Sequence, residues 1–157
     1  MNRFFQDEHH LDWLRSVFAA GSVRWQIPFS HHPVYCAGPS HLNDAEMVET
    51  LVPLFDRAGV RLVLAGHEHN FQLCEDGDRT YVVSGAGGNL REGQPEDFAA
   101  AHTRAWNGQA HLVLVELDER RATLTPVSGL LPDGTLHMMT GIGPDNETVM
   151  PPYVVKA

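Results

Sequence analysis

The sequence predicts an α/β (α+β) fold in which helices cover a β-sheet. Over residues 6–65, two helix-like segments alternate with two short apolar strands, and several more strands separated by turns follow them. The chain has 157 residues, 43% of them hydrophobic, so it can bury one core of ordinary domain size. We therefore expect residues 1–157 to form a single domain.

Two segments are predicted to be amphipathic helices. From Gln6 to Ala20, apolar side chains recur at helical spacing, and a glycine follows the last of them. The second helix is predicted to start after Asp44, a good N-cap residue, and to end at Gly59. Pro53 lies inside this segment and is expected to kink the helix or to break it locally.

Short apolar segments predict the strands. Trp25 to Ser30 alternates apolar and polar residues, and Pro28 favours an edge position or an early end for this strand. Val60 to Ala65 is almost continuously apolar, which is typical of a strand buried on both faces. Further strands are predicted near residues 70–74, 81–84, 111–117 and 122–127.

The other segments connect these elements or follow them. Turn residues at 75–78 and 118–121 predict two hairpins. Residues 85–108 are rich in Gly, Ala and Asn, and we expect a loop with one short helix there. From about residue 128 to 157, Gly and Pro recur, so this C-terminal segment is expected to be irregular or weakly stranded.

The charge and hydropathy of the chain disfavour two classes of partner. Eleven Lys and Arg against twenty Asp and Glu give a formal net charge of −9, which repels nucleic acid. No apolar run approaches the roughly 20 residues that span a bilayer, so no membrane span is expected. The first ten residues lack the apolar stretch of a secretory signal, and the sequence leaves the localisation open.

Two histidine clusters follow two of the predicted strands. His31 and His32 come directly after the first of these strands, and His67 and His69 come directly after the second. If the two strands are parallel neighbours, both loops leave the same edge of the sheet, and their imidazoles can reach one ion. Ten histidines among 157 residues also allow incidental surface histidines, but the placement of both clusters at strand ends favours a metal site.

These segments resemble the calcineurin-like metallophosphoesterases, and within them the purple acid phosphatase branch. The resemblance runs in order from about Gln6 to Leu117 and depends on four motifs: His31-His-Pro-Val-Tyr35, Gly38-Pro-Ser-His41, Leu62-Val-Leu-Ala-Gly-His-Glu-His-Asn70 and Tyr81-Val-Val-Ser-Gly-Ala-Gly-Gly88. It implies that the chain corresponds to the C-terminal half of the family's β-sandwich, and so to a partial domain.

The resemblance also implies a chemistry and a set of site residues. The family hydrolyses phosphate esters with hydroxide activated by Zn, Fe, Mn or similar ions, so a phosphorylated small molecule is the implied substrate. By motif position, three residues match metal ligands: His31, His67 and His69. His41 matches the catalytic histidine that contacts the phosphate or protonates the leaving group. His32 and Asn70 are candidates for supporting the ligands or for contacting the substrate.

Several metal-binding elements of the family have no counterpart in this chain. The family's Asp-x-His, Gly-Asp-x-x-Asp and Gly-Asn-His elements lie upstream of the matching region. Asp7-Glu8-His9 spells Asp-x-His, but it falls in the first turn of a predicted helix, where we expect solvated side chains.

Three interpretations therefore remain open: a phosphoesterase with two ions, a mononuclear zinc hydrolase with three histidines, and a truncated domain without catalysis. Whether one or two ions bind per chain also remains open.

Two further expectations concern association and the cysteines. Half of a β-sandwich exposes a strand edge and apolar surface, so we expect either a homodimer that completes the missing half or a rearranged minimal domain. Cys36 and Cys74 each lie five residues after a histidine of the predicted site loops, which leaves a disulfide and two free thiols as alternatives.

Overall fold

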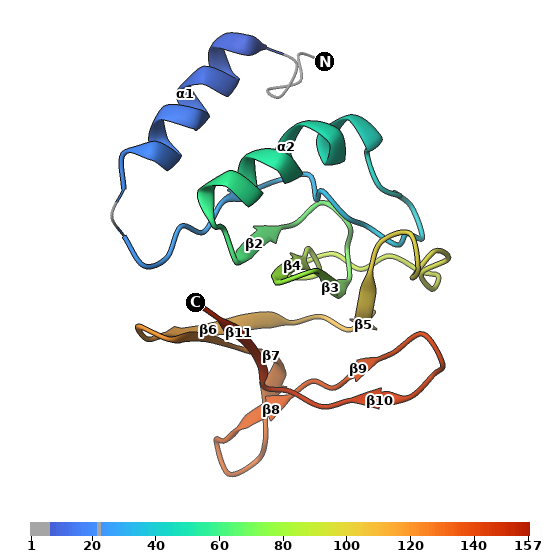
Figure 1. The fold of residues 1–157 in the computed structure, drawn as a ribbon. Helices are drawn as coiled ribbons and strands as arrows, with labels where there is room; N and C mark the ends of the chain where they lie inside the picture. The colour runs from blue at the N-terminus through green and yellow to red at the C-terminus, as the bar shows by residue number, and fades with distance from the viewer. Residues whose placement is uncertain (1–6, 22) are drawn as a thin grey trace.

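The computed structural model describes residues 7–21 and 23–157, in which two β-sheets pack against each other, helix α2 lies over the first sheet and helix α1 lies against α2 (Figure 1). The expected helix start at Gln6 lies outside the described residues. The seven-stranded sheet has the order β1-β2-β4-β3-β5-β9-β10, and the second sheet has the order β11-β7-β6, with β8 paired to β7. This arrangement confirms the predicted mixed α/β class with a helix-covered sheet.

Both helices begin at capping side chains that the sequence contains. Helix α1 spans Glu8–Ala19, and the carboxylate of Asp7 accepts a hydrogen bond from the backbone of His9 at 2.9 Å. Helix α2 spans Ala45–Ala58, with Asp44 as its N-cap and Gly59 as its left-handed C-cap. The helix continues through Pro53 without a break. Asp7 is thus a helix cap, which agrees with a solvated role for the Asp7-Glu8-His9 segment.

The strands of the first sheet are β1 (Phe29–Ser30), β2 (Leu62–Ala65), β3 (Phe71–Asp76), β4 (Arg79–Ser84), β5 (Thr103–Asn107), β9 (Gly141–Ile142) and β10 (Thr148–Val149). Those of the second sheet are β6 (Leu112–Leu117), β7 (Arg121–Leu130), β8 (Leu136–Met138) and β11 (Tyr153–Lys156). The hairpin turns predicted between β3 and β4 and between β6 and β7 are both present.

Strands β1 and β2 are parallel neighbours, as the metal-site prediction requires. Ser30 pairs with Ala65, the last residue of each strand, so the two strands end at the same edge of the sheet. Strand β4 continues the parallel arrangement on the other side of β2. Strand β1 is the edge strand of the described sheet, in agreement with the prediction from Pro28.

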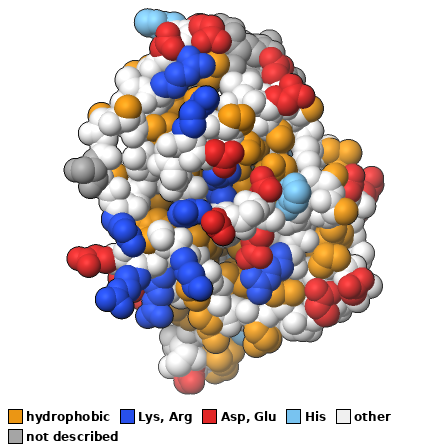
Figure 2. Space-filling view, in the orientation of Figure 1, with side chains coloured by type: hydrophobic (Ala, Val, Ile, Leu, Met, Phe, Trp, Pro, Cys, Tyr) orange, Lys and Arg blue, Asp and Glu red, His pale blue; other side chains and the backbone are white. Residues whose placement is uncertain are grey.

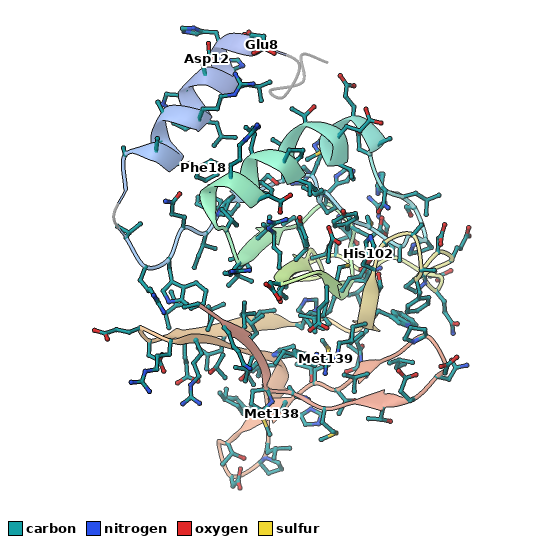
Figure 3. All side chains as sticks on the ribbon, viewed as in Figure 1. Glu8, Asp12, Phe18, His102, Met138 and Met139 are labelled. Atoms are coloured by element: carbon teal, nitrogen blue, oxygen red, sulfur yellow. The ribbon has the colours of Figure 1, made fainter. Side chains whose placement is uncertain are left out.

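Two hydrophobic cores lie on opposite faces of the first sheet. Between this sheet and the helices, Met47, Leu51 and Phe55 of α2 pack with Val63. Leu62 belongs instead to the core between the two sheets. Adjacent residues of β2 thus enter different cores, which confirms that this strand is buried on both faces. Phe18 joins α1 to α2 through an edge contact with Phe55, at 6.0 Å between ring centroids (Figure 3).

The segment that precedes β1 is anchored to the second sheet. The indole of Trp25 donates to the carbonyl of Asp118 at 2.7 Å, and Arg24 donates to the carbonyl of Glu119 at 2.8 Å. These bonds attach residues 24–25 to the β6–β7 turn. The strand predicted over 25–30 is shorter in the structure and spans Phe29–Ser30. In Figure 2, Lys and Arg side chains gather at the lower left, on the side where Figure 1 shows this turn.

One local expectation needs correction. Residues 85–108 contain no helix; they hold a turn at 98–102 and the strand β5, which pairs with β3. The segment 128–157 is weakly stranded, which is one of the two forms expected from the sequence: it holds the end of β7 and four short strands, β8 to β11. In β11, Tyr153 and Val155 point into the core while Val154 is exposed, which explains the strand there. Cys36 and Cys74 are two buried free thiols, which is one of the two alternatives that the sequence left open.

No helix in residues 7–21 or 23–157 is long and apolar enough to span a bilayer.

Candidate metal centre

The candidate site lies where β1 and β2 end. The backbone N–H of Gly66 donates to the carbonyl of His31 at 3.2 Å, which joins the two loops directly after the strands. The next residue, His67, has a φ of 65°, in the left-handed region that side chains other than glycine seldom adopt. This backbone turn, together with a bond from the N–H of Glu68 to the carbonyl of Gly66, places His67 beside His31.

Three histidines converge at this edge of the sheet. The nitrogen atoms that His31, His32 and His67 can offer to a metal ion all lie within 4.8 Å of one another. Nδ1 of His67 lies 3.0 Å from Nε2 of His31. Imidazole nitrogens are the ligands that Zn, Fe and similar ions prefer, so the donor set fits a metal ion of this kind.

The environment keeps His67 neutral. Burial lowers the pKa of His67 to about 4, and the neighbouring His41, His32, His31 and Arg91 add to this shift. A neutral imidazole retains the lone pair with which it binds a metal, so His67 is suited to act as a ligand near pH 7.

His41 lies next to the three histidines. Its ring centroid is 3.9 Å from that of His67. On its other side, Nδ1 of His41 lies 2.7 Å from Oε2 of Glu68 and 3.1 Å from the guanidinium of Arg91. The structure therefore brings the predicted catalytic histidine to the histidine cluster and adds two charged partners that the sequence reasoning missed.

His69 and Asn70 are placed differently from the cluster. Among the described residues, His69 is not part of the group of three, and its Nδ1 is buried without a hydrogen-bond partner. Asn70 is buried, and its amide donates to the carbonyl of Gly38 and accepts from Gln72. The Asn70 side chain therefore joins the loop before α2 to strand β3. The group of three contains His32, for which the sequence suggested a supporting role or a substrate contact.

Glu68 is the main site feature without a predicted role. Its side chain has an exposed fraction of 0%, although both neighbouring histidines are partly exposed. The triplet His67-Glu68-His69 carried no periodic signal, because it forms a bend in which His67 has a left-handed φ of 65°. Burial of a charged residue between two site histidines could not be inferred without the surrounding chain.

The backbone of Glu68 fits against a glycine of a neighbouring strand end. A Cβ atom on Gly85 would lie 2.1 Å from the carbonyl oxygen of Glu68, well inside contact distance. Gly85 also donates its N–H to the carbonyl of Asn70. Only glycine allows this close approach, so Gly85 determines where Glu68 lies.

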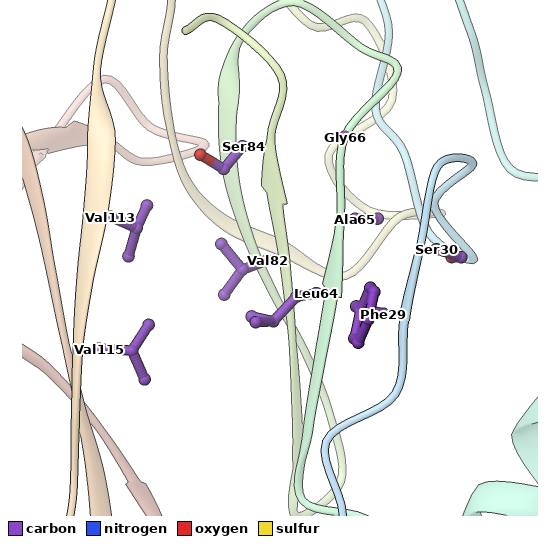
Figure 4. Close-up of a pocket in the computed structure, with 9 residues that line it drawn as sticks. All are labelled: Phe29, Ser30, Leu64, Ala65, Gly66, Val82, Ser84, Val113 and Val115. Carbon is purple, nitrogen blue, oxygen red and sulfur yellow. The ribbon is translucent and has the colours of Figure 1, made fainter.

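A second polar pair lies beside the centre, at the end of β4. Ser84 Oγ is 3.1 Å from Nε2 of His111, and Nδ1 of His111 is 2.9 Å from the carbonyl of Gln109. Ser84 lines a cavity of about 320 Å³ between the two sheets, with Leu64 and Val82 on one wall and Val113 and Val115 on the other (Figure 4).

His111 should make the stability of the fold depend on pH. Burial lowers its pKa below the ordinary value of 6.5, so the folded state favours the neutral ring. The stabilisation from this group is fully present above pH 6.5 and is lost as the pH falls through the lowered pKa. In urea unfolding at pH 7.5 and pH 5, we expect His111→Gln to lose less stability on acidification than the wild type does. An identical loss in both proteins would contradict this role for His111.

The fold and the site together define a class: a layered α/β sandwich with histidines gathered at the carboxyl ends of parallel strands. Residues 1–71 match the family model described as calcineurin-like phosphoesterase. The chain is 29% identical over 125 residues to the tartrate-resistant acid phosphatase type 5 of Oryctolagus cuniculus. This match covers 73% of this chain and 37% of that protein. It is 33% identical over 76 residues to purple acid phosphatase 17 of Arabidopsis thaliana. This match covers 47% of this chain and 22% of that protein.

Solved structures share the fold. The purple acid phosphatase PPD1 from yellow lupin (Lupinus luteus) seeds superposes with a TM-score of 0.67 at 16% identity, covering 82% of this chain and 27% of that one. GAP50, the anchor in the inner membrane complex of Plasmodium, superposes with a TM-score of 0.68 at 21% identity. This superposition covers 84% of this chain and 43% of that one. The resemblance to calcineurin-like phosphoesterases of the purple acid phosphatase branch is thus confirmed over part of their length. The chain spans 37% and 22% of the length of the two curated relatives.

Proposed function

We propose that this chain acts as a metal-dependent phosphatase that hydrolyses phosphate esters of small molecules. The observation that carries the proposal is the convergence of His31, His32 and His67 within 4.8 Å at the ends of two parallel strands. Family relatives that are acid phosphatases support the same reaction class. A bound Zn, Fe or Mn ion would lower the pKa of its water and would polarise the phosphoryl oxygens.

The residues of the chain have separate roles in this proposal. His31 and His67 hold the ion, and His32 lies close enough to complete the set. His41, in ring contact with His67, protonates the leaving oxygen of the ester. His69 is proposed as the ligand of a second ion, supported by its buried Nδ1, which has no hydrogen-bond partner among the described residues.

The test is the metal content of the purified, untagged chain, combined with hydrolysis of p-nitrophenyl phosphate. About two ions per chain with activity would support the phosphatase with His69 as a ligand. One ion with activity would favour the mononuclear zinc hydrolase with three histidines. A chain that binds neither Zn, Fe nor Mn after incubation, and that hydrolyses nothing, would identify a non-catalytic domain and refute the proposal.

We further propose that two copies of the chain associate through the open side of the sandwich. Strands β1 and β6 each form one edge of the two described sheets, and both border the cavity between the sheets. Phe29 on β1 is 84% exposed and Leu114 on β6 is 41% exposed. Unpaired edges that carry exposed apolar side chains favour pairing with another chain.

Light scattering coupled to size exclusion should therefore give twice the mass of one chain. We expect Leu114→Lys to yield the monomer, because a lysine on an edge strand opposes pairing. Leu131→Lys is the matched control, since Leu131 is similarly exposed, at 43%, but lies outside the strands. A wild-type chain that is monomeric at all concentrations would exclude this association.

A further inference from the structure

Glu68 is a fully buried carboxylate in the middle of the site. Removing a charge from water is costly unless partners compensate for it, so the groups around Glu68 indicate what it does. Oε2 of Glu68 contacts Nδ1 of His41 at 2.7 Å and lies 3.7 Å from Nη1 of Arg91. Oε1 has no hydrogen-bond partner among the described residues. The carboxylate is therefore anchored on one side, through its contact with His41.

The geometry decides where the proton of His41 lies. The guanidinium of Arg91, 3.7 Å from Oε2, favours the ionised form of Glu68. An ionised carboxylate only accepts hydrogen bonds, so its contact of 2.7 Å with Nδ1 places the proton of His41 on that nitrogen. Arg91 only donates, so its approach to the same nitrogen at 3.1 Å cannot also be a hydrogen bond. The guanidinium instead compensates for the charge of Glu68 across 3.7 Å. Glu68 therefore contacts Nδ1 and makes no hydrogen bond with the other ring nitrogen, Nε2.

We propose that Glu68 is a positioning residue that, together with Arg91, fixes the ring of His41 so that Nε2 faces the leaving oxygen of the phosphate ester. The catalytic part of this inference rests on the proposed phosphatase function. The orientation of the ring does not, because it follows from the contacts of Glu68 alone.

The surrounding backbone is built to place this carboxylate. The left-handed φ of His67 and the two backbone bonds of Glu68, to Gly66 and Asn70, turn the residue inward between two partly exposed histidines. The missing side chain at Gly85 provides the room for it. An apolar residue at position 68 would fill the same space without the cost of a buried charge, so packing alone does not account for a glutamate.

The first experiment measures the proton on His41 directly. A long-range ¹H–¹⁵N correlation spectrum of the full chain, with His41 assigned by His41→Asn, reports which ring nitrogen is protonated. We expect a protonated Nδ1 in the wild type and a loss of that preference in Glu68→Gln. An unprotonated Nδ1 in the wild type would mean that Arg91 donates to it, and would overturn the inference. The wild-type spectrum gives this answer even if the variant fails to fold.

The second experiment separates positioning of an acid from general disruption. Proton donation matters most for a poor leaving group, so we expect Glu68→Gln to lower kcat roughly 10- to 100-fold on an alkyl phosphate such as glycerol phosphate. On p-nitrophenyl phosphate, whose leaving group needs little protonation, the expected loss is below about 3-fold. KM should change little on both substrates. An equal loss of kcat on both substrates would indicate a merely structural role and would refute the inference.

Two controls complete the design. Glu92→Gln changes an exposed carboxylate next to Arg91 and should leave both rates unchanged. In a His41→Asn background, Glu68→Gln should cause no further loss specific to the alkyl phosphate, because the acid that it positions is already absent. If the wild type hydrolyses neither ester, the proposed phosphatase function fails, while the spectrum still decides the orientation of His41.

Discussion

Replacing His67 by alanine is expected to weaken metal binding by about 100-fold or more and to lower phosphatase activity at least as much. His67 is the residue that links the cluster, because it contacts the ring of His31, that of His32 and that of His41. Its imidazole stays neutral near pH 7, so its loss removes a ready ligand. Calorimetric titration with Zn²⁺ measures the affinity, and hydrolysis of p-nitrophenyl phosphate measures the activity.

His9→Ala is the matched control for this prediction. His9 lies in the exposed first turn of α1, within the only Asp-x-His segment that resembles the missing family element. Since Asp7 acts there as a helix cap, we expect unchanged metal binding in His9→Ala. A His67→Ala variant that keeps full affinity and activity would show that the metal centre lies elsewhere. Loss of binding in His9→Ala would instead assign the N-terminal segment to the site.

Replacing Gly85 by alanine is expected to lower the free energy of unfolding by about 3 kcal/mol. The added Cβ would lie 2.1 Å from the carbonyl oxygen of Glu68, and the backbone must shift to relieve the overlap. The same shift would move Glu68 away from His41. Urea unfolding followed by circular dichroism gives the stability difference between variant and wild type.

Gly87→Ala provides the comparison for this second prediction. A Cβ on Gly87 meets no atom within 4 Å, although the residue lies in the same loop. Its variant should therefore unfold at nearly the wild-type urea concentration. If Gly85→Ala and Gly87→Ala have the same stability, the close approach between Gly85 and Glu68 is not a packing constraint.

Much of the fold could be predicted because its signals are local. The caps Asp44 and Gly59 define α2 by their own side chain and backbone preferences. The continuous apolar character of β2 reflects its two buried faces. Strand β5 escaped prediction because Thr103 to Asn107 has little periodicity of its own and is defined by pairing with β3, about thirty residues earlier. Pairing between distant segments leaves no pattern in the sequence of one strand.

The candidate site also has one part that the sequence predicts and one part that it does not. His31 and His67 could be placed together because parallel strands end at one edge, and the pairing of Ser30 with Ala65 confirms that geometry. The inward position of Glu68 depends on Gly85, which belongs to another strand end, and on Arg91, a loop residue far along the chain. The contacts among Glu68, Gly85 and Arg91 form only in the folded chain, so no local sequence motif predicts them. Whether His69 acts as a ligand stays a prediction.

The bond from Gly66 to His31 has a consequence for how an ion would enter. It holds the two histidine loops together through the backbone, independently of any ligand. The conformational entropy of bringing the loops together is therefore lost during folding and not when the metal arrives. Small zinc domains, in contrast, gather their ligands only as the ion binds. In this chain, hydrophobic packing on both faces of β2 would offset the entropy lost in assembling the site. A chelator would then remove the ion while the two loops keep their arrangement.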